Sequence, residues 1–263
     1  STVFKIKLFK MYSRLLLQER DYQSLEKFLI ESYNEFGKDK LFDRSNHNEK
    51  LTLLTYLSNC LYKTKKYKQS LKYSEELLSG MKEYDYFLHD KYLFYYYNIL
   101  VLNYAKTDKK KALDYLNKAS RSEVIKKLPS YNAFIYLNRS LIYYYEDNYK
   151  ESQKNIARLI MQEDFLLLDN SFQLKILVTE LMIRISISNK NLDNKFKDIK
   201  KNYKSLLEEE NHLREKIMIG LLSKKVHNED IVEDKKKLLD YMSDSDSEDI
   251  DIISYNSWIR NNL

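Results

Sequence analysis

The sequence predicts an all-α protein, a right-handed α-solenoid of about six antiparallel helix pairs that ends in an acidic segment and a short docking helix. Three observations support this. The 263 residues include only three glycines and one proline, which turns between strands require. Apolar residues recur three and four positions apart, as in Leu54, Leu57 and Leu61. Related segments also return at intervals of 45, 42 and 40 residues.

Polar breaks divide the chain into predicted helix pairs. The breaks are FGKDK at Gly37, SGMKEYD at Gly80, KLPSYN at Pro129, LDNS at Asn170 and SNKN at Asn189. We expect Gly80 to cap a helix C-terminus, Pro129 to lie in a first helical turn, and Asp169 or Asn170 to cap the next helix. The predicted units are about 1–43, 47–83, 88–121, 129–165, 171–207 and 210–243 in a repeat domain 1–243, followed by an acidic linker and short helix at 244–263.

The second helices of the first four units open in similar ways. Their sequences are RDYQSLEKFL, KKYKQSLKYSEELL, KKKALDYLNKA and DNYKESQKNIARLI, in which Tyr22, Tyr67 and Tyr149 hold equivalent places and Lys109 is near the third. A weaker fifth member is NLDNKFKDIKKNYKSLL. The sixth unit pairs HLREKIMIGLLSK with EDIVEDKKKLLDYM. Beyond residue 165 the prediction therefore rests on helix pairing alone.

The fourth unit gives the best match to a known repeat. In YLNRSLIYYYEDNYKESQKNI, Tyr136 is an opening aromatic, Ser140 a small residue, Tyr143 a following tyrosine, Tyr149 a turn aromatic and Ser152 a second small residue. This pattern resembles the tetratricopeptide repeat. The period is longer than the usual 34 residues, the final proline is absent and serine or larger residues replace glycine. We therefore describe residues 1 to 165 as tetratricopeptide-like.

Side-chain size explains the pattern, because two antiparallel helices approach closely only where a small residue faces a larger one. We expect Ser58 and Ser140 to admit the partner helix. In KYLFYYYNILVLNY, Lys91 to Tyr104, five tyrosines and a phenylalanine crowd together. We expect Tyr97 and Tyr104, like Tyr143 in the next unit, to fill the space between helices. Neighbouring rings, 100° away per residue, must then point elsewhere; these are Tyr95, Tyr96, Tyr144 and Tyr145.

Enzyme signatures are scarce in this sequence. It contains no HExxH, GxGxxG, GxxxxGK[ST] or GxSxG motif, and its three glycines cannot form a glycine-rich phosphate loop. The histidines are not at metal-binding spacing and are expected to be surface or turn residues; they are His47, His89, His212 and His227. The single cysteine, Cys60, is expected to be a small buried hydrophobe. We expect no enzyme activity, cofactor or metal.

The charge is unevenly placed along the chain. The net charge is +6, but Glu229 to Asp251 holds ten acids and three lysines, so the remainder is basic. Lysines interleave with aromatics from Tyr62 to Tyr73, a pattern that can neutralise phosphate and stack on bases. RNA binding is thus an alternative. The 39 acids against 45 basic residues, and the lack of a base-reading repeat, disfavour it.

The tetratricopeptide resemblance implies that the first helices line a concave face in which a peptide or protein segment lies. We predict a non-catalytic scaffold or adaptor that presents a tyrosine-rich groove. An alternative is the peptide-sensing module of a larger regulator. The residues expected to face a partner are Tyr95, Asn98, Leu102, Leu137, Asn138, Leu141 and Tyr144.

The two ends of the chain carry further expectations. No apolar run approaches the ~20 residues of a membrane-spanning helix, and no targeting signal is evident, so we expect a cytoplasmic protein. Because the chain opens without Met inside a helical pattern, we expect it to be the C-terminal portion of a longer solenoid. Near the other end, Ile252, Tyr255 and Ile259 have helical spacing around the only tryptophan, Trp258. We expect this segment to dock on its own solenoid.

Overall fold

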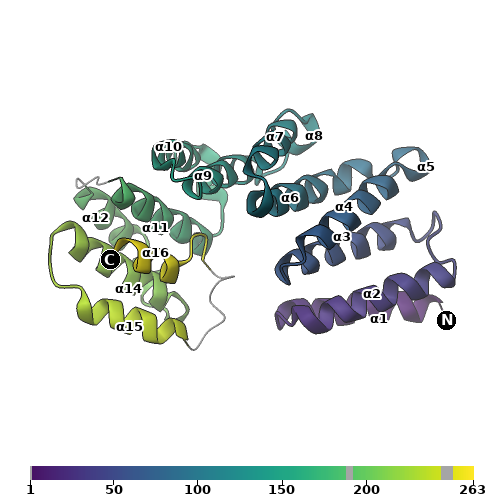
Figure 1. Cartoon of the computed structure of the whole chain (residues 1–263), viewed down its shortest axis with the longest axis horizontal. Coiled ribbons are helices and arrows are strands. Elements are labelled where there is room, and N and C mark those ends of the chain that lie inside the picture. Colours follow the sequence, from purple (N-terminus) through teal and green to yellow (C-terminus); the bar gives the residue numbers. More distant parts are fainter. Residues whose placement is uncertain (1, 188–191, 244–250) are drawn as a thin grey trace. The chain divides into compact units, whose positions relative to one another are not determined.

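The computed structural model describes residues 2–187, 192–243 and 251–263, and all regular structure in those ranges is helical, with no strand (Figure 1). The chain forms two compact units, Ser1–Leu128 and Pro129–Leu263. Their boundary falls at the predicted break KLPSYN, between the third and fourth predicted helix pairs. Most of the predicted acidic linker, 244–250, lies outside the described residues.

The first unit consists of successive helix pairs. Its helices are α1 (Thr2–Gln18), α2 (Tyr22–Lys38), α3 (His47–Lys63), α4 (Tyr67–Met81), α5 (Glu83–Tyr86), α6 (His89–Thr107), α7 (Lys109–Ser120) and α8 (Glu123–Lys126). Helix α1 packs on α2, α3 on α4 and α6 on α7. Contacts of α2 with α3, and of α4 with α6, join each pair to the next. The unit is therefore a series of packed helix pairs.

The turns inside the pairs explain how the chain folds back with so few glycines. A residue with positive φ follows the first helix, and the next backbone N–H donates to the carbonyl five positions earlier at 2.8 to 3.0 Å. The positive-φ residues are Arg20, Lys65 and Asp147, with φ of 57°, 62° and 57°. This is the Schellman arrangement, in which a left-handed residue satisfies the last carbonyls of a helix. Tyr22, Tyr67 and Tyr149 follow two residues later, so the repeat seen in the sequence marks a repeated turn.

Buried serines lie where two paired helices approach each other. Ser70 Oγ donates to the Ser58 carbonyl oxygen at 2.7 Å, and Ser140 Oγ donates to that of Ser152 at 2.9 Å. All four side chains are fully buried. The structure thus confirms that small residues admit the partner helix in these two pairs.

Gly80 has a different role from the predicted C-terminal cap. It lies inside α4, φ is not positive at any glycine, and Lys82 is the residue that caps the helix. A Cβ at Gly80 would lie 2.9 Å from Cδ2 of Leu51, which is fully buried in α3. The glycine is therefore explained by the close approach of α3 and α4 and not by backbone conformation.

Alanine at two helical glycines should change stability in opposite directions. Gly80→Ala should lower the free energy of unfolding by about 1–2 kcal/mol, because overpacking outweighs the gain in helix propensity. Gly220→Ala in the second unit, where a Cβ would meet nothing within 4 Å, should raise it by up to about 1 kcal/mol. Urea denaturation of both variants checks this. Stabilisation by both would show that α3 and α4 are not so closely packed.

The tyrosines of α6 are distributed differently from the prediction. Tyr96 is 7% exposed and buried with Tyr92, whereas Tyr97 and Tyr104 are half-buried. Helix α6 packs on α3 and α4 as well as on α7, so more of its circumference is covered than one helix pair requires. Tyr104 does lie between helices, because its ring stacks on that of Tyr115 in α7 at 5.4 Å. Tyr143 is likewise half-buried, not fully buried.

The second unit continues the pairing up to α10 and then becomes less regular. Its elements are the π-helical turn η1 (Ala133–Leu137), α9 (Asn138–Tyr144), α10 (Tyr149–Ile160), the 3-10 turn η2 (Glu163–Leu167), α11 (Asn170–Ser186), α12 (Asp193–Asn202), α13 (Lys204–Leu207), the 3-10 turn η3 (Glu210–His212), α14 (Leu213–Val226), α15 (Val232–Ser243) and α16 (Tyr255–Asn262). Asp169 caps α11 by accepting from the Phe172 N–H at 3.2 Å, as expected. Helix α11 packs on α10 and α14, and α15 packs on α14.

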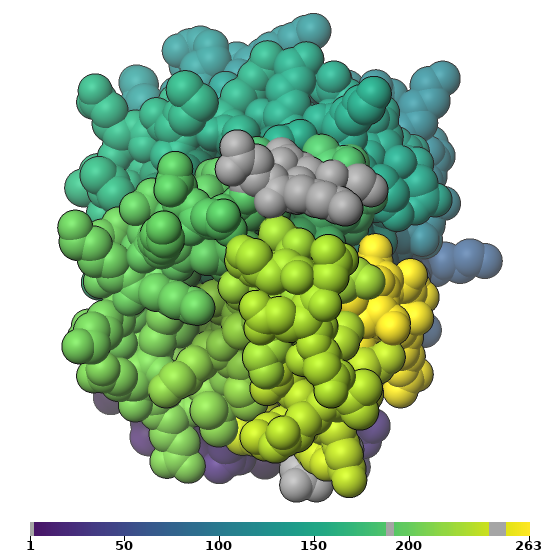
Figure 2. All heavy atoms as spheres, turned by 90° about the vertical axis from the view of Figure 1, so that its left-hand side faces the viewer, coloured from purple at the N-terminus to yellow at the C-terminus, as the bar shows by residue number. Residues whose placement is uncertain are grey.

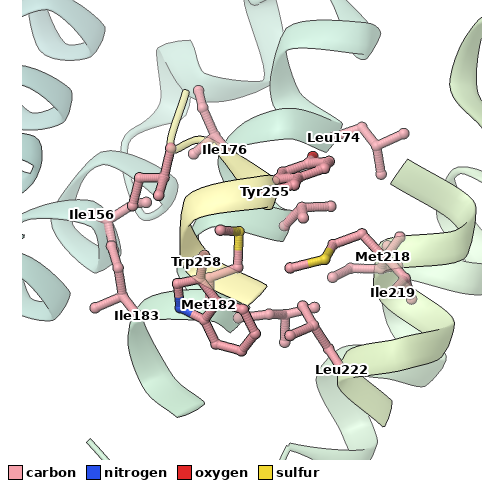
Figure 3. Close-up of a cluster of buried hydrophobic side chains, with 14 of the residues drawn as sticks. Ile156, Leu174, Ile176, Met182, Ile183, Met218, Ile219, Leu222, Tyr255 and Trp258 are labelled. Carbon is pink, nitrogen blue, oxygen red and sulfur yellow. The ribbon is translucent and has the colours of Figure 1, made fainter. Parts of the chain in front are cut away.

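The C-terminal segment completes the core of the second unit. Figure 3 shows Tyr255 and Trp258 of α16 among side chains of α11 and α14, such as Met182 and Met218. Trp258 is 1% exposed, and its Nε1–H donates to Ser186 Oγ at 3.1 Å. In Figure 2 the yellow C-terminal helix lies beside the yellow-green α15, which it also contacts. The tryptophan segment therefore packs on helices of its own unit.

Candidate functional site

One face of α6 carries three of the residues predicted to meet a partner. Tyr95, Asn98 and Leu102 follow Lys91 at intervals of four, three and four residues, which places them along one side of the helix. Tyr95 is 44% exposed, and Asn98 and Leu102 are half-buried. The structure thus brings these three residues together.

Contacts with α3 hold the base of this face in place. The Tyr92 hydroxyl donates to the Asn48 carbonyl oxygen at 3.0 Å and lies 2.7 Å from the Thr52 hydroxyl. Burial raises the pKa of Tyr92, so its hydroxyl stays protonated. The ring of Tyr95 lies 6.1 Å from that of Tyr92. Among the described residues the Asn98 amide has no hydrogen-bond partner, so it can bind a group from outside.

The four predicted residues of the second unit are less available. Leu137 is 9% exposed and belongs to the hydrophobic core, because its π-helical turn packs on α10; the expectation that it faces a partner was wrong. The Asn138 amide donates to the Phe134 carbonyl oxygen of its own helix at 2.7 Å. Leu141 and Tyr144 are half-buried and pack against the core. Partner binding by these residues stays a prediction, as does a groove that combines residues of both units.

A surface pocket in the second unit was missed by sequence reasoning. It has a volume of about 250 Å³, and its walls include Phe165, Leu166 and Tyr203. Glu180 at its edge is buried and accepts ion pairs from Arg184 and Lys195, each at 2.8 Å. Beside it lie three strongly exposed apolar side chains, Met161 at 82%, Leu166 at 74% and Leu167 at 81%. The run of three leucines in a predicted polar break was the available signal.

The residue types that could perform chemistry are engaged in packing. Burial raises the pKa of the Cys60 thiol to about 12, and its Sγ donates to the Tyr22 carbonyl oxygen at 3.1 Å, consistent with a small buried side chain. His47 is fully buried beside the Tyr84 ring, and His212 is 7% exposed, so the surface location expected for these two was wrong. In the described part of the chain, no three or more His, Cys, Asp or Glu residues form a group that could hold a metal.

The lysine- and tyrosine-rich stretch around the second turn is also largely used internally. The rings of Tyr62 and Tyr67 lie 5.8 Å apart, and the Tyr73 ring lies 5.8 Å from that of Tyr33 in α2. Lys72 Nζ lies 5.7 Å from the centre of the Tyr73 ring. Packing between helix pairs therefore accounts for these rings without a nucleic acid.

Comparison with known proteins identifies no relative: no family model, no curated protein and no solved structure matches the chain. Within the described ranges, no helix combines the length and apolar character needed to cross a membrane.

Proposed function

We propose that the chain is a non-catalytic scaffold or adaptor, built as a right-handed, tetratricopeptide-like helical repeat, that binds a protein segment along α6. The observation that carries the proposal is the outward face of α6. A half-buried amide without an internal partner, Asn98, lies there between an exposed ring, Tyr95, and a half-buried apolar side chain, Leu102. An amide with free donor and acceptor can bind the backbone of an extended segment.

The energetics of the face support binding by a preformed surface. Tyrosine combines a large apolar ring with few rotatable bonds and is enriched at the residues that dominate interface energies. Tyr92, Asn48 and Thr52 already hold α6 to α3, so little conformational entropy should be lost when a partner binds. The repeated turns and serine contacts support the helical-repeat assignment.

Photo-cross-linking from two positions of the same unit tests the binding face. A photoreactive phenylalanine analogue at Tyr95 should capture a small set of proteins from a lysate of the source cells, identified by mass spectrometry. The control is the same group at Tyr86, which is 59% exposed and lies in α5. Asn98→Ala, added to the Tyr95 probe, should lower the yield of the captured protein several-fold, because a backbone hydrogen bond is lost. Equal capture from both positions, unaffected by Asn98→Ala, would contradict the proposal.

A further inference from the structure

The outer side of α1 bears an apolar stripe that nothing in the first unit covers. The stripe consists of Phe4, Leu8, Met11 and Leu15, which are 64%, 47%, 73% and 46% exposed. Their spacing of four, three and four residues aligns them on one side of the helix. The opposite side, with Phe9 among others, is buried against α2 and α3. Helix α1 is therefore apolar on two sides, whereas an end helix that faces only water is normally polar outside.

The next first helix shows what such a stripe contacts in this fold. Forty-five residues further on, the positions of the last three stripe residues are held by Leu53, Tyr56 and Cys60 of α3. Leu53 is fully buried and Cys60 is 2% exposed. The first helix pair covers them: Cys60 Sγ donates to the Tyr22 carbonyl oxygen, and the Phe9 ring lies 6.4 Å from that of Tyr56. On α3, this side is thus the surface on which neighbouring helices pack.

Charge defines the chemistry of the occupant. Helix α1 contains Lys5, Lys7, Lys10 and Arg14 and no acidic residue. Lys5 pairs with Glu35 and Asp39 of α2, and Lys10 pairs with Glu49 of α3. Lys7 and Arg14 are exposed, lie seven residues apart along one edge of the stripe and have no ion pair among the described residues. A covering helix with carboxylates along this edge would complement them.

A second copy of the chain fits this edge poorly. If two copies paired antiparallel through the stripe, the two-fold axis would bring Lys7 of one copy beside Arg14 of the other. Such like-charge contacts disfavour the pairing. We propose that the α1 stripe is the docking surface for an acidic amphipathic helix of a separate protein, whose apolar residues pack on the stripe and whose carboxylates pair with Lys7 and Arg14. This surface is distinct from the α6 face and does not depend on its function.

Two synthetic helical peptides test this proposal with the full chain. Both have the length of α1 and the same leucine stripe; one carries Glu and the other Lys along the edge that would face Lys7 and Arg14. Fluorescence anisotropy of labelled peptides should show that the Glu peptide binds at least about tenfold tighter than the Lys peptide and weakens as salt is added. Equal affinities for the two peptides, or no binding of the Glu peptide, would overturn the proposal.

Three variants separate specific docking from general adhesion. Met11→Lys should weaken the Glu peptide at least about tenfold, since it places a charge in the centre of the stripe. Met161→Lys, at an equally exposed methionine of the second unit, should leave it unchanged. Lys7→Glu with Arg14→Glu should reverse the preference between the peptides. Failure of this reversal would refute the charge pairing, and a dimer in sedimentation equilibrium that Met11→Lys dissociates would assign the stripe to a second copy instead.

Discussion

Replacement of Trp258 by alanine should lower the free energy of unfolding of the second unit by about 3–5 kcal/mol, the range seen when a large buried ring is removed. The ring is 1% exposed and lies between helices α11 and α14, where Met182, Met218 and Leu222 surround it (Figure 3). The loss includes the buried apolar area, the cavity left behind and the hydrogen bond from Nε1–H to Ser186. Because a domain is typically stable by about 5–15 kcal/mol, the variant should be close to unfolding.

Urea denaturation followed by far-ultraviolet circular dichroism measures this effect, because the variant no longer contains a tryptophan. Trp258→Phe is the matched control, since it keeps an aromatic ring and loses only part of the volume and the hydrogen bond. It should lose clearly less stability than Trp258→Ala. Hydrogen exchange should show faster exchange in α11 and α14 but not in α1 to α4, which belong to the other unit. Unchanged stability of Trp258→Ala would show that α16 does not form part of the core.

The stability of the second unit should fall as pH rises from about 4 to 7, through a buried ion pair that anchors the same C-terminal segment. Arg214 Nη2 donates to Asp251 Oδ2 at 2.7 Å, and the Tyr255 backbone N–H donates to the same oxygen at 3.2 Å. The Asp251 side chain is 2% exposed. Burial raises the pKa of Asp251 from 3.8 to about 6, although the positive charge of Arg214 acts in the opposite direction.

The sign of the pH effect follows from this direction. Between the unfolded and folded pKa values the native carboxyl binds the proton more tightly than the unfolded one, so its contribution to stability is complete below pH 3.8 and is lost as pH rises through about 6. The difference of roughly two pKa units corresponds to about 3 kcal/mol. Urea titrations followed by the fluorescence of Trp258, the only tryptophan, report on this unit alone.

Asp251→Asn isolates the contribution of this carboxyl. His227 in the same unit also has a raised pKa, chiefly because of a backbone hydrogen bond with Ser223 and secondarily because of Asp193, and therefore gives a slope of the same sign. The informative quantity is the difference between wild type and variant. We expect the decrease in stability between pH 4 and pH 7 to be smaller in Asp251→Asn by about 3 kcal/mol. Equal slopes would show that Asp251 does not titrate with a raised pKa in the folded unit.

Local features of the sequence determined the helical class and the position of several turns. Scarce glycine and proline, and apolar spacing of three and four, depend only on the preference of each segment for a helix. The repeated Tyr22, Tyr67 and Tyr149 marked turns that the structure shows to share one hydrogen-bond pattern. Ser58 and Ser140 were identified as helix contacts because close approach requires a small side chain whatever the wider arrangement.

Which faces are covered was decided by the tertiary structure, because burial depends on neighbours far away in the sequence. Tyr96, Leu137 and His47 are buried since additional helices cover sides that a single pair would leave open. Gly80 was misread as a cap because its contact, Leu51, is in another helix. The sequence could place Tyr95, Asn98 and Leu102 on one side of a helix. Only packing shows that this side remains accessible, that the α1 stripe is uncovered and that a pocket opens beside Leu166.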